Sequence, residues 1–232
     1  MGKRSNKKRR KLDFYPTPFK AVQPLIPHLN GVRRFAEPCC GDGRLVRHLE
    51  SFGFVCVYAV DIADGQDALA HTDYGINPEA IVTNPPHTHE VLAKLLPHFI
   101  RIAPTWLLLP MDFASNARDA VFLAASTDIV PFGRVRWIDG TTDTSKDNFG
   151  WFRFQLGHRD GPRVHPRGLD PINTSPINTS LVTTSPVNTN PVNTRVHAIA
   201  PTGADRGKDR HSPGYMAAYM RRRRAKALSQ QL

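Results

Sequence analysis

The chain has 232 residues, of which 40% are hydrophobic and 22% charged, with three cysteines and a formal net charge of +11. This length accommodates one domain of about 150 residues with extensions. No run of 18 apolar residues is present and the N-terminus lacks the apolar segment of a secretory signal, so we expect a cytoplasmic protein without a membrane span. The adjacent Cys39 and Cys40 are expected to be reduced thiols, and the ten histidines lack the spacing of a zinc site, so no metal is expected.

The excess positive charge lies at the two ends of the chain. Residues 1–12 carry seven Lys/Arg and no acid, whereas residues 13–160 carry 13 basic and 17 acidic residues. Residues 201–232 carry eight basic and two acidic residues. Clustered Lys and Arg release counterions from phosphate backbones, so we expect both ends to bind a polyanion such as DNA. The alternative is that the charged ends only keep the protein soluble.

The same divisions predict the domain organisation. A disordered basic arm at 1–12 precedes one folded domain at 13–160, and a low-complexity linker at 161–200 leads to a basic tail at 201–232. The linker contains five pentads of the Pro-Ile-Asn-Thr-Ser type, in which prolines at period five exclude a helix and favour an extended flexible segment over a solenoid. The tail includes a predicted short basic helix with Tyr and Met on one side, at 215–224.

Strands and helices alternate in the predicted domain. Strands are expected at 34–37, 54–60, 81–83, 106–109, 129–132, 135–138 and 150–156, with the last two forming a hairpin. A short helix near 19–29 is interrupted by prolines, and a further helix is expected at 113–125. Two amphipathic helices lie between these, with the apolar positions Leu45, Val46, Leu49 and Phe52 in one and Val91, Leu92, Leu95, Leu96, Phe99 and Ile100 in the other. The three tryptophans, Trp106, Trp137 and Trp151, are expected in the core.

The strand at 81–83 ends in Asn84-Pro85-Pro86-His87. Neither proline can donate to a strand ladder, so the strand stops there and the Asn84 side chain faces a crevice. The Asn84 carboxamide oxygen and the Pro85 carbonyl then offer two acceptors to one incoming amine, and the His87 ring is placed to stack on the flat group that carries it. The alternative reading is a turn that only ends the strand.

A second motif consists of a strand, a glycine turn, a helix, a strand and an acid, which form half of a Rossmann unit. Gly41 and Gly43 allow a ligand to approach the backbone, and Asp61 is placed to bind ribose hydroxyls. The turn lacks the third glycine and the Lys/Ser of phosphate-binding loops, which favours a nucleoside without a pyrophosphate. Asp67 is a candidate acceptor for an adenine amine. The alternative is that Asp61 and Asp67 are a strand-end acid and a helix cap.

Together these motifs resemble the class I S-adenosylmethionine-dependent methyltransferases, and within them the adenine-specific DNA amino-methyltransferases, over about residues 13–156. The resemblance implies an α/β Rossmann-like fold with a mostly parallel seven-stranded sheet and a C-terminal antiparallel hairpin. It also implies S-adenosylmethionine as the cofactor and methyl transfer to the 6-amino group of adenine in DNA. The small size and basic ends resemble the enzymes of bacteriophages, which implies the host cytoplasm and a monomer or weak dimer.

The resemblance assigns roles to single residues. Tyr15 and Thr17 belong to a segment similar to the family's N-terminal Thr-Pro segment, near the methionine carboxylate of the cofactor. The loop that resembles the family's methionine-binding loop contributes Glu37, Pro38, Cys39, Gly41 and Gly43. The ribose acid is Asp61, followed by Ile62, and the adenine-contacting acid is Asp67, followed by Ala68. The catalytic motif is matched by Asn84, Pro85, Pro86 and His87.

Two features depart from this family. It usually has Tyr, Phe or Trp at the position of His87, and it usually has a separate target-recognition domain, which the residues after 160 do not resemble. Three alternative functions remain open: methylation of glutamine in a protein, methylation of adenine in RNA, and DNA binding by a degenerate methyltransferase.

Overall fold

The computed structural model describes residues 15–74, 77–137 and 144–167. The arm at 1–12, the five pentads at 171–195, the tail at 201–232 and the predicted helix within it lie outside the described residues. Within the three described ranges, no helix combines the length and apolarity needed to cross a bilayer.

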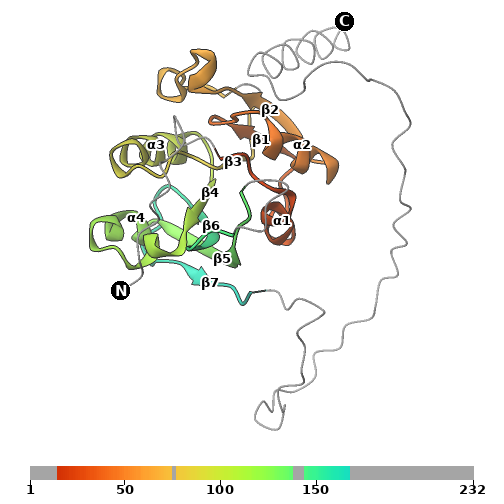
Figure 1. Ribbon diagram of the computed structural model, residues 1–232. Helices are drawn as coiled ribbons and strands as arrows, with labels where there is room; N and C mark the ends of the chain where they lie inside the picture. The colour runs from red at the N-terminus through yellow and green to blue at the C-terminus, as the bar shows by residue number, and fades with distance from the viewer. Residues whose placement is uncertain (1–14, 75–76, 138–143, 168–232) are drawn as a thin grey trace, which may run out of the picture. The chain divides into compact units, whose positions relative to one another are not determined.

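One seven-stranded sheet has the strand order β2-β1-β3-β4-β6-β5-β7 (Figure 1). Neighbouring strands are parallel except for β6, which is antiparallel to both β4 and β5. The predicted α/β fold, a mostly parallel sheet with a C-terminal antiparallel pair, is confirmed. The strands are β1 (Arg34–Glu37), β2 (Val55–Ala59), β3 (Ala80–Thr83), β4 (Thr105–Pro110), β5 (Ser126–Arg134), β6 (Asn148–Phe154) and β7 (Arg163–Val164).

Helices cover both faces of the sheet, with α1 and α2 on one side and α3 and α4 on the other (Figure 1). The α-helices are α1 (Phe19–Val22), α2 (Arg44–Ser51), α3 (His89–Ile102) and α4 (Ala120–Ala124). Short 3-10 turns complete the fold: η2 (Gln23–His28), η3 (Ile62–Asp64), η4 (Ala68–Ala70), η5 (Met111–Ser115) and η6 (Ala117–Asp119). The prolines in 23–28 convert the continuation of α1 into the 3-10 turn η2, as the sequence predicts.

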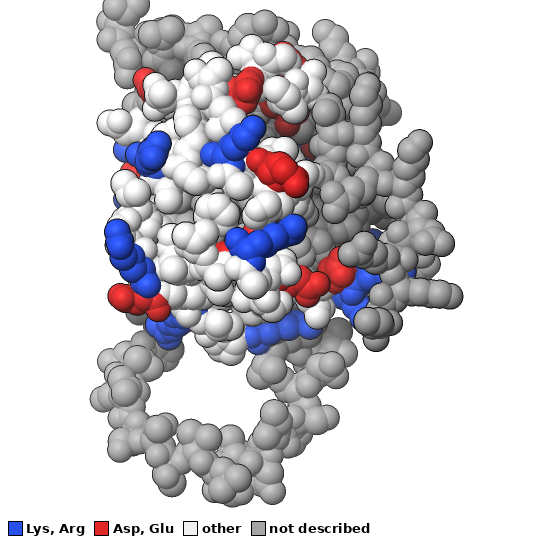
Figure 2. All heavy atoms as spheres, turned by 90° about the vertical axis from the view of Figure 1, so that its left-hand side faces the viewer, with Lys and Arg blue, Asp and Glu red and all other residues white. Residues whose placement is uncertain are grey.

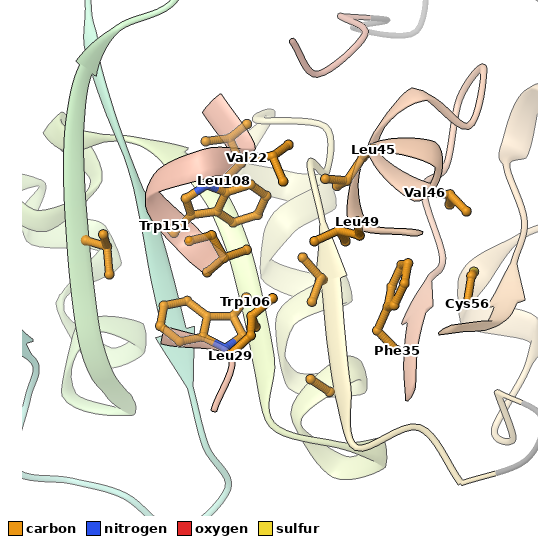
Figure 3. Packing of buried hydrophobic residues seen from close by; sticks show 14 of the residues in the cluster. Val22, Leu29, Phe35, Leu45, Val46, Leu49, Cys56, Trp106, Leu108 and Trp151 are labelled. Carbon is orange, nitrogen blue, oxygen red and sulfur yellow. The ribbon is translucent and has the colours of Figure 1, made fainter. Parts of the chain in front are cut away.

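Two buried clusters fill the space on either side of the sheet. Trp106 and Leu108 of β4 and Trp151 of β6 belong to the cluster under α1 and α2 (Figure 3). Leu107 of β4 and Phe152 of β6 belong to the cluster under α3. Successive side chains of a strand point to opposite faces, so the continuous apolar runs of β4 and β6 supply both clusters at once.

Two residues predicted on buried helix faces are exposed instead. Phe52 is 40% exposed, and its ring stacks on that of Phe19 at 5.5 Å. It lies just after α2 ends at Ser51, so it no longer follows the helical period that buries Leu49. Val91 is 39% exposed because it lies in the first turn of α3, outside the buried stripe. The buried face of each helix is therefore shorter at one end than the apolar pattern of the sequence predicts.

The C-terminal part of the sheet also differs from the prediction. The strand expected at 129–132 lies within β5, which continues through a bulge near Gly133, at a φ of +95°, and ends at Arg134. The strand expected at 135–138 is wrong, because residues 135–137 form no strand, and the hairpin partner of β6 is β5. The helix expected at 113–125 consists of η5, η6 and the five-residue α4. β7 pairs with β5 beyond residue 160, where composition alone indicates a linker.

We predict that Trp151→Phe lowers the free energy of unfolding by about 2–4 kcal/mol, because it removes buried apolar volume together with a hydrogen bond to a buried carbonyl. Trp151 is fully buried, and its Nε1 donates to the Ala21 carbonyl at 2.7 Å. The control is Trp106→Phe, since Trp106 lies in the same cluster but its indole N–H has no partner among the described residues. Urea unfolding should show a loss about 1 kcal/mol larger for the Trp151 variant. Equal losses would contradict a stabilising role of the bond to α1.

Candidate active site

The site lies where the chain leaves β1 and β3 in opposite directions. β1 is the neighbour of both β2 and β3, and all three strands are parallel. From β1 the chain passes through α2 to β2 on one side, and from β3 it passes through α3 to β4 on the other side. The loops after the two strands therefore diverge and leave a crevice at the carboxyl ends, which is the usual position of ligand sites in open α/β sheets.

The glycine turn after β1 is held against the end of β2 by backbone hydrogen bonds. The N–H of Cys40 donates to the carbonyl of Val60 at 2.9 Å, and the N–H of Gly43 donates to the carbonyl of Cys40 at 2.7 Å. Gly41 and Gly43 have φ values of +50° and +72°, a region that L side chains rarely adopt. The two glycines are therefore required by the turn, which keeps its backbone close to the crevice.

Asp61 fixes this turn to the segment after β2. One carboxylate oxygen accepts the N–H of Gly41 at 2.7 Å, and the other accepts the N–H of Ala63 at 2.8 Å. Asp61 is thus the N-cap of η3, a role that the sequence alternative gave only to Asp67, and it also bridges to the glycine turn. Each carboxylate oxygen retains acceptor capacity, so this role is compatible with ribose binding. The neighbouring Ile62 is 54% exposed and offers an apolar surface next to the acid.

Asp67 caps the next 3-10 turn in the same way. Its carboxylate accepts the N–H of Leu69 at 2.9 Å, and its side chain lies at the surface. Ala68 is buried, and its carbonyl accepts the hydroxyl of the fully buried Tyr74 at 3.0 Å. The buried Tyr74 therefore fixes the turn around Asp67, while the Asp67 carboxylate remains accessible to a ligand.

Glu37, the last residue of β1, is the most unusual group of the site. Its side chain is 1% exposed, and within the described part of the chain Oε2 has no hydrogen-bond partner. Burial raises the pKa of Glu37 well above its ordinary value, and the charges of Asp61 and Asp42 raise it further. A buried carboxyl oxygen without a partner is costly, so the site is suited to a ligand that brings a cation or a hydrogen-bond donor to Oε2.

Two cysteines and a proline complete the turn. Pro38 is buried, and Cys39 is partly buried. Burial, followed by the charge of Asp61, raises the pKa of the Cys39 thiol, so Cys39 stays protonated at neutral pH and is no nucleophile. The neighbouring Cys40 is a core residue.

Asn84 is held in one orientation by the N-terminal segment. Its Nδ2 donates to the carbonyl of Tyr15 at 3.0 Å, and because a carbonyl can only accept, this contact fixes which end of the carboxamide is nitrogen. The Oδ1 atom is left as an acceptor with no hydrogen-bond partner in the described ranges. The following Pro85 is buried, and Pro86 is partly buried. Thr17, two residues after Tyr15, is 3% exposed, so this segment is packed against the domain.

His87 is anchored instead of projecting freely from the loop. Its Nε2 lies 2.9 Å from the carbonyl of Leu108, one residue beyond the last β4 residue paired with β3. The imidazole therefore contacts a β4 carbonyl that lies beyond the end of β3 at Thr83. The His87 ring also lies 5.9 Å from Phe149 at an interplanar angle of 38°. Stacking of this ring on a substrate stays a prediction.

A row of aromatic side chains borders the same loop. The ring of Trp137 lies 5.9 Å from that of Tyr15 and 5.1 Å from that of Phe149, which in turn contacts His87. Trp137 was expected in the core, but it is only partly buried and packs against the edge of one core cluster. Trp106 and Trp151 are core residues as predicted. The site residues predicted from the sequence include neither Trp137 nor Phe149, although their rings contact those of Tyr15 and His87.

No protein-family model and no curated protein sequence matches the chain. Solved structures with similar folds include a Pyrococcus horikoshii protein assigned as an RNA methyltransferase, with 12% identity, 62% of this chain and 88% of that chain covered, and a TM-score of 0.47. An assigned class I S-adenosylmethionine-dependent methyltransferase from Listeria monocytogenes has 15% identity, 68% and 67% coverage, and a TM-score of 0.46. The methyltransferase subunit of a type I restriction-modification system from Streptococcus thermophilus has 11% identity, 61% and 44% coverage, and a TM-score of 0.41. These low values assign neither a substrate nor a cofactor to this chain.

The raised pKa of Glu37 predicts a pH-dependent cost in stability. Because the folded pKa lies above the unfolded value of about 4.3, the cost is absent below that pH and grows as pH rises toward the folded pKa. Glu37→Gln should therefore be more stable than the wild type at neutral pH, and this advantage should vanish near pH 4. Thermal unfolding against pH measures the difference. The exposed Glu90→Gln is measured over the same pH range as the control. A flat difference for Glu37→Gln would mean that the carboxyl group is not perturbed.

Proposed function

We propose that the protein transfers a methyl group from S-adenosylmethionine to the exocyclic 6-amino group of adenine in DNA. The observation that carries the proposal is the fixed carboxamide of Asn84, whose Nδ2 is held by Tyr15 so that Oδ1 remains an acceptor at the edge of the crevice. An acceptor in this position suits an amino group that must give up electron delocalisation before it can react.

The residues around the crevice fit the proposed cofactor. S-adenosylmethionine carries an ammonium group and a sulfonium group, and the buried Oε2 of Glu37 lacks a partner of that kind among the described residues. Asp61 retains acceptor capacity for ribose hydroxyls, Ile62 offers an exposed apolar side chain for the adenine ring, and Asp67 is accessible to an adenine amine. When bound, S-adenosylmethionine supplies an electrophilic methyl group.

Asn84 and Pro85 would orient the nucleophile. The lone pair of an adenine 6-amino group is delocalised into the ring, which makes the nitrogen a poor nucleophile. Hydrogen bonds from its two hydrogens to Asn84 Oδ1 and to the Pro85 carbonyl would favour a tetrahedral nitrogen and stabilise the positive charge that develops on it. In duplex DNA the base must first leave the stack, at a cost of about a few kcal/mol.

The distribution of charge supports a polyanionic substrate. Lys and Arg are concentrated at 1–12 and 201–232, whereas the domain between them has more acids than bases. Figure 2 shows that, on the face over α3 and α4, the described Lys and Arg are interspersed with Asp and Glu and form no single basic patch. We infer that the charged ends supply the phosphate contacts, which act independently of base sequence.

Transfer of an isotopically labelled methyl group tests the function. The full chain is incubated with S-adenosylmethionine and, separately, with DNA, RNA or a glutamine-containing peptide, and the digested products are analysed by mass spectrometry. We expect 6-methyladenine in DNA, and for Asn84→Ala we expect a turnover lower by about 100-fold or more with unchanged cofactor affinity. A label found in RNA or on glutamine would overturn the substrate assignment, and an absence of cofactor binding would overturn the proposal as a whole.

Substitutions of His87 separate a structural role from a role in base stacking. His87→Phe keeps an aromatic ring but removes the hydrogen bond to Leu108, so we expect the rate per folded molecule to persist while stability falls by about 1–3 kcal/mol. His87→Ala should lose the same stability and, in addition, about 1–3 kcal/mol of transition-state stabilisation. Single-turnover rates and urea unfolding of the three proteins measure both effects. A wild-type rate in His87→Ala would exclude stacking on the substrate.

A further inference from the structure

A polar cavity lies at the amino ends of β3 and β4, opposite the carboxyl ends that form the candidate active site. Its volume is about 180 Å³, and it is lined by Ala80 at the start of β3 and Pro104 just before β4. Asn84 follows the other end of β3, so the length of that strand, about 13 Å at 3.3 Å per residue, separates the cavity from the crevice. The cavity is also smaller than the roughly 300 Å³ at which pockets for nucleoside-sized ligands begin.

The floor of the cavity is a row of side chains that follows from the strand register. Trp106 of β4 pairs with Arg153 of β6, and Arg153 pairs with Asp128 of β5. Directly paired residues of antiparallel strands point to the same face, so the three side chains lie next to one another. His28 at the end of η2 and the following Asn30 line the cavity opposite this row.

The acidic groups of the cavity already have partners. The Glu79 carboxylate accepts the backbone N–H of Arg34 at 2.9 Å and its Nη2 at 3.2 Å. Asp128 accepts the Thr127 hydroxyl at 2.8 Å and lies 2.8 Å from His165 Nε2. These contacts lower the pKa of both carboxyl groups, so both stay ionised, but their oxygen atoms are already bonded to donors of the protein.

The donor groups, in contrast, are only partly used. Arg153 Nη1 contacts the Thr127 hydroxyl at 3.0 Å and Asp128 at 3.7 Å, while its other guanidinium N–H groups have no partner in the described ranges. The same holds, within those ranges, for the indole N–H of Trp106, the ring nitrogens of His28 and the carboxamide of Asn30. Donors that converge on a small polar cavity without acceptors of their own are typical of an anion site.

We propose that this cavity binds a small oxyanion of the size of phosphate, held by Arg153, Trp106, His28 and Asn30. The volume equals about six waters at roughly 30 Å³ each, which is enough for a phosphate group with part of its hydration shell. The site is independent of the methyl-transfer proposal, since it shares no residue with the crevice.

The imidazole of His28 makes the proposed binding dependent on pH. Burial lowers the pKa of His28, and the nearby charges of His165 and Arg163 lower it further, against the opposing charge of Asp128. His165 follows β7, with its ring 4.4 Å from that of His28, while Arg153 and Glu79 line the cavity from β6 and from the segment before β3. Without an anion His28 is therefore neutral at pH 7. An anion favours the protonated ring, so affinity rises as pH falls.

The three tryptophans of the chain provide a local readout in the full-length protein. With nitrogen-15-labelled tryptophan, sodium phosphate is titrated at constant ionic strength, at about pH 6 and about pH 8, on either side of the ordinary histidine pKa of about 6.5. We expect a saturable shift of the Trp106 indole resonance, with tighter binding at the lower pH. The indole of Trp151, which is bonded to the Ala21 carbonyl, should not move.

Variants assign the shift to the cavity. Arg153→Gln should weaken binding by about tenfold or more, the loss expected for one hydrogen bond between charged groups. His28→Gln should remove most of the pH dependence, and it keeps the test valid if Arg153→Gln unfolds. The control is Arg101→Gln, an exposed position on α3, which should bind as the wild type does. A shift that never saturates, or that Arg101→Gln weakens equally, would show only a general ionic effect and overturn the site. Displacement of phosphate from Trp106 by a short DNA duplex would identify a nucleic-acid phosphate as the occupant and overturn the assignment to a free anion.

Discussion

The divergence of the chain after β1 and β3 is the constraint on which the candidate active site depends. Because the two strands are adjacent and parallel, the glycine turn and the Asn84 loop start side by side at one edge of the sheet. Asp61 then fixes the glycine turn from the β2 side, while Tyr15 fixes Asn84 from the N-terminal segment. The polar atoms of the site are therefore held by backbone contacts, and a ligand would meet a largely preformed crevice.

The buried carboxyl group of Glu37 shows how stability and binding oppose each other here. Its position at the end of a central strand removes it from water, and the described residues offer no partner for Oε2. This unpaired oxygen lowers the stability of the empty domain, and a ligand that satisfies it recovers that free energy as affinity.

The two edges of the sheet have complementary polar character. The carboxyl edge presents oxygen atoms in need of donors, at Glu37 and Asn84, whereas the opposite edge presents donors in need of acceptors, at Arg153 and Trp106. The same parallel strands connect both edges, so the length of β3 separates the proposed anion site from the crevice for which we propose a cationic cofactor. Occupation of one need not exclude occupation of the other.

The sequence by itself determined the elements whose signal is local. The bounds predicted for β1 are those observed, and the glycines of the turn and the prolines after β3 lie where strand ends require them. Tertiary structure alone decided the rest. The orientation of Asn84 depends on Tyr15, 69 residues away, and the anchoring of His87 depends on β4 extending beyond β3. Likewise β7 has only two residues and no periodicity of its own, so its strand conformation exists only because β5 offers it a ladder of hydrogen bonds. Periodicity and turn chemistry act between neighbours in the chain, whereas these contacts join distant residues whose proximity is a consequence of the folded sheet.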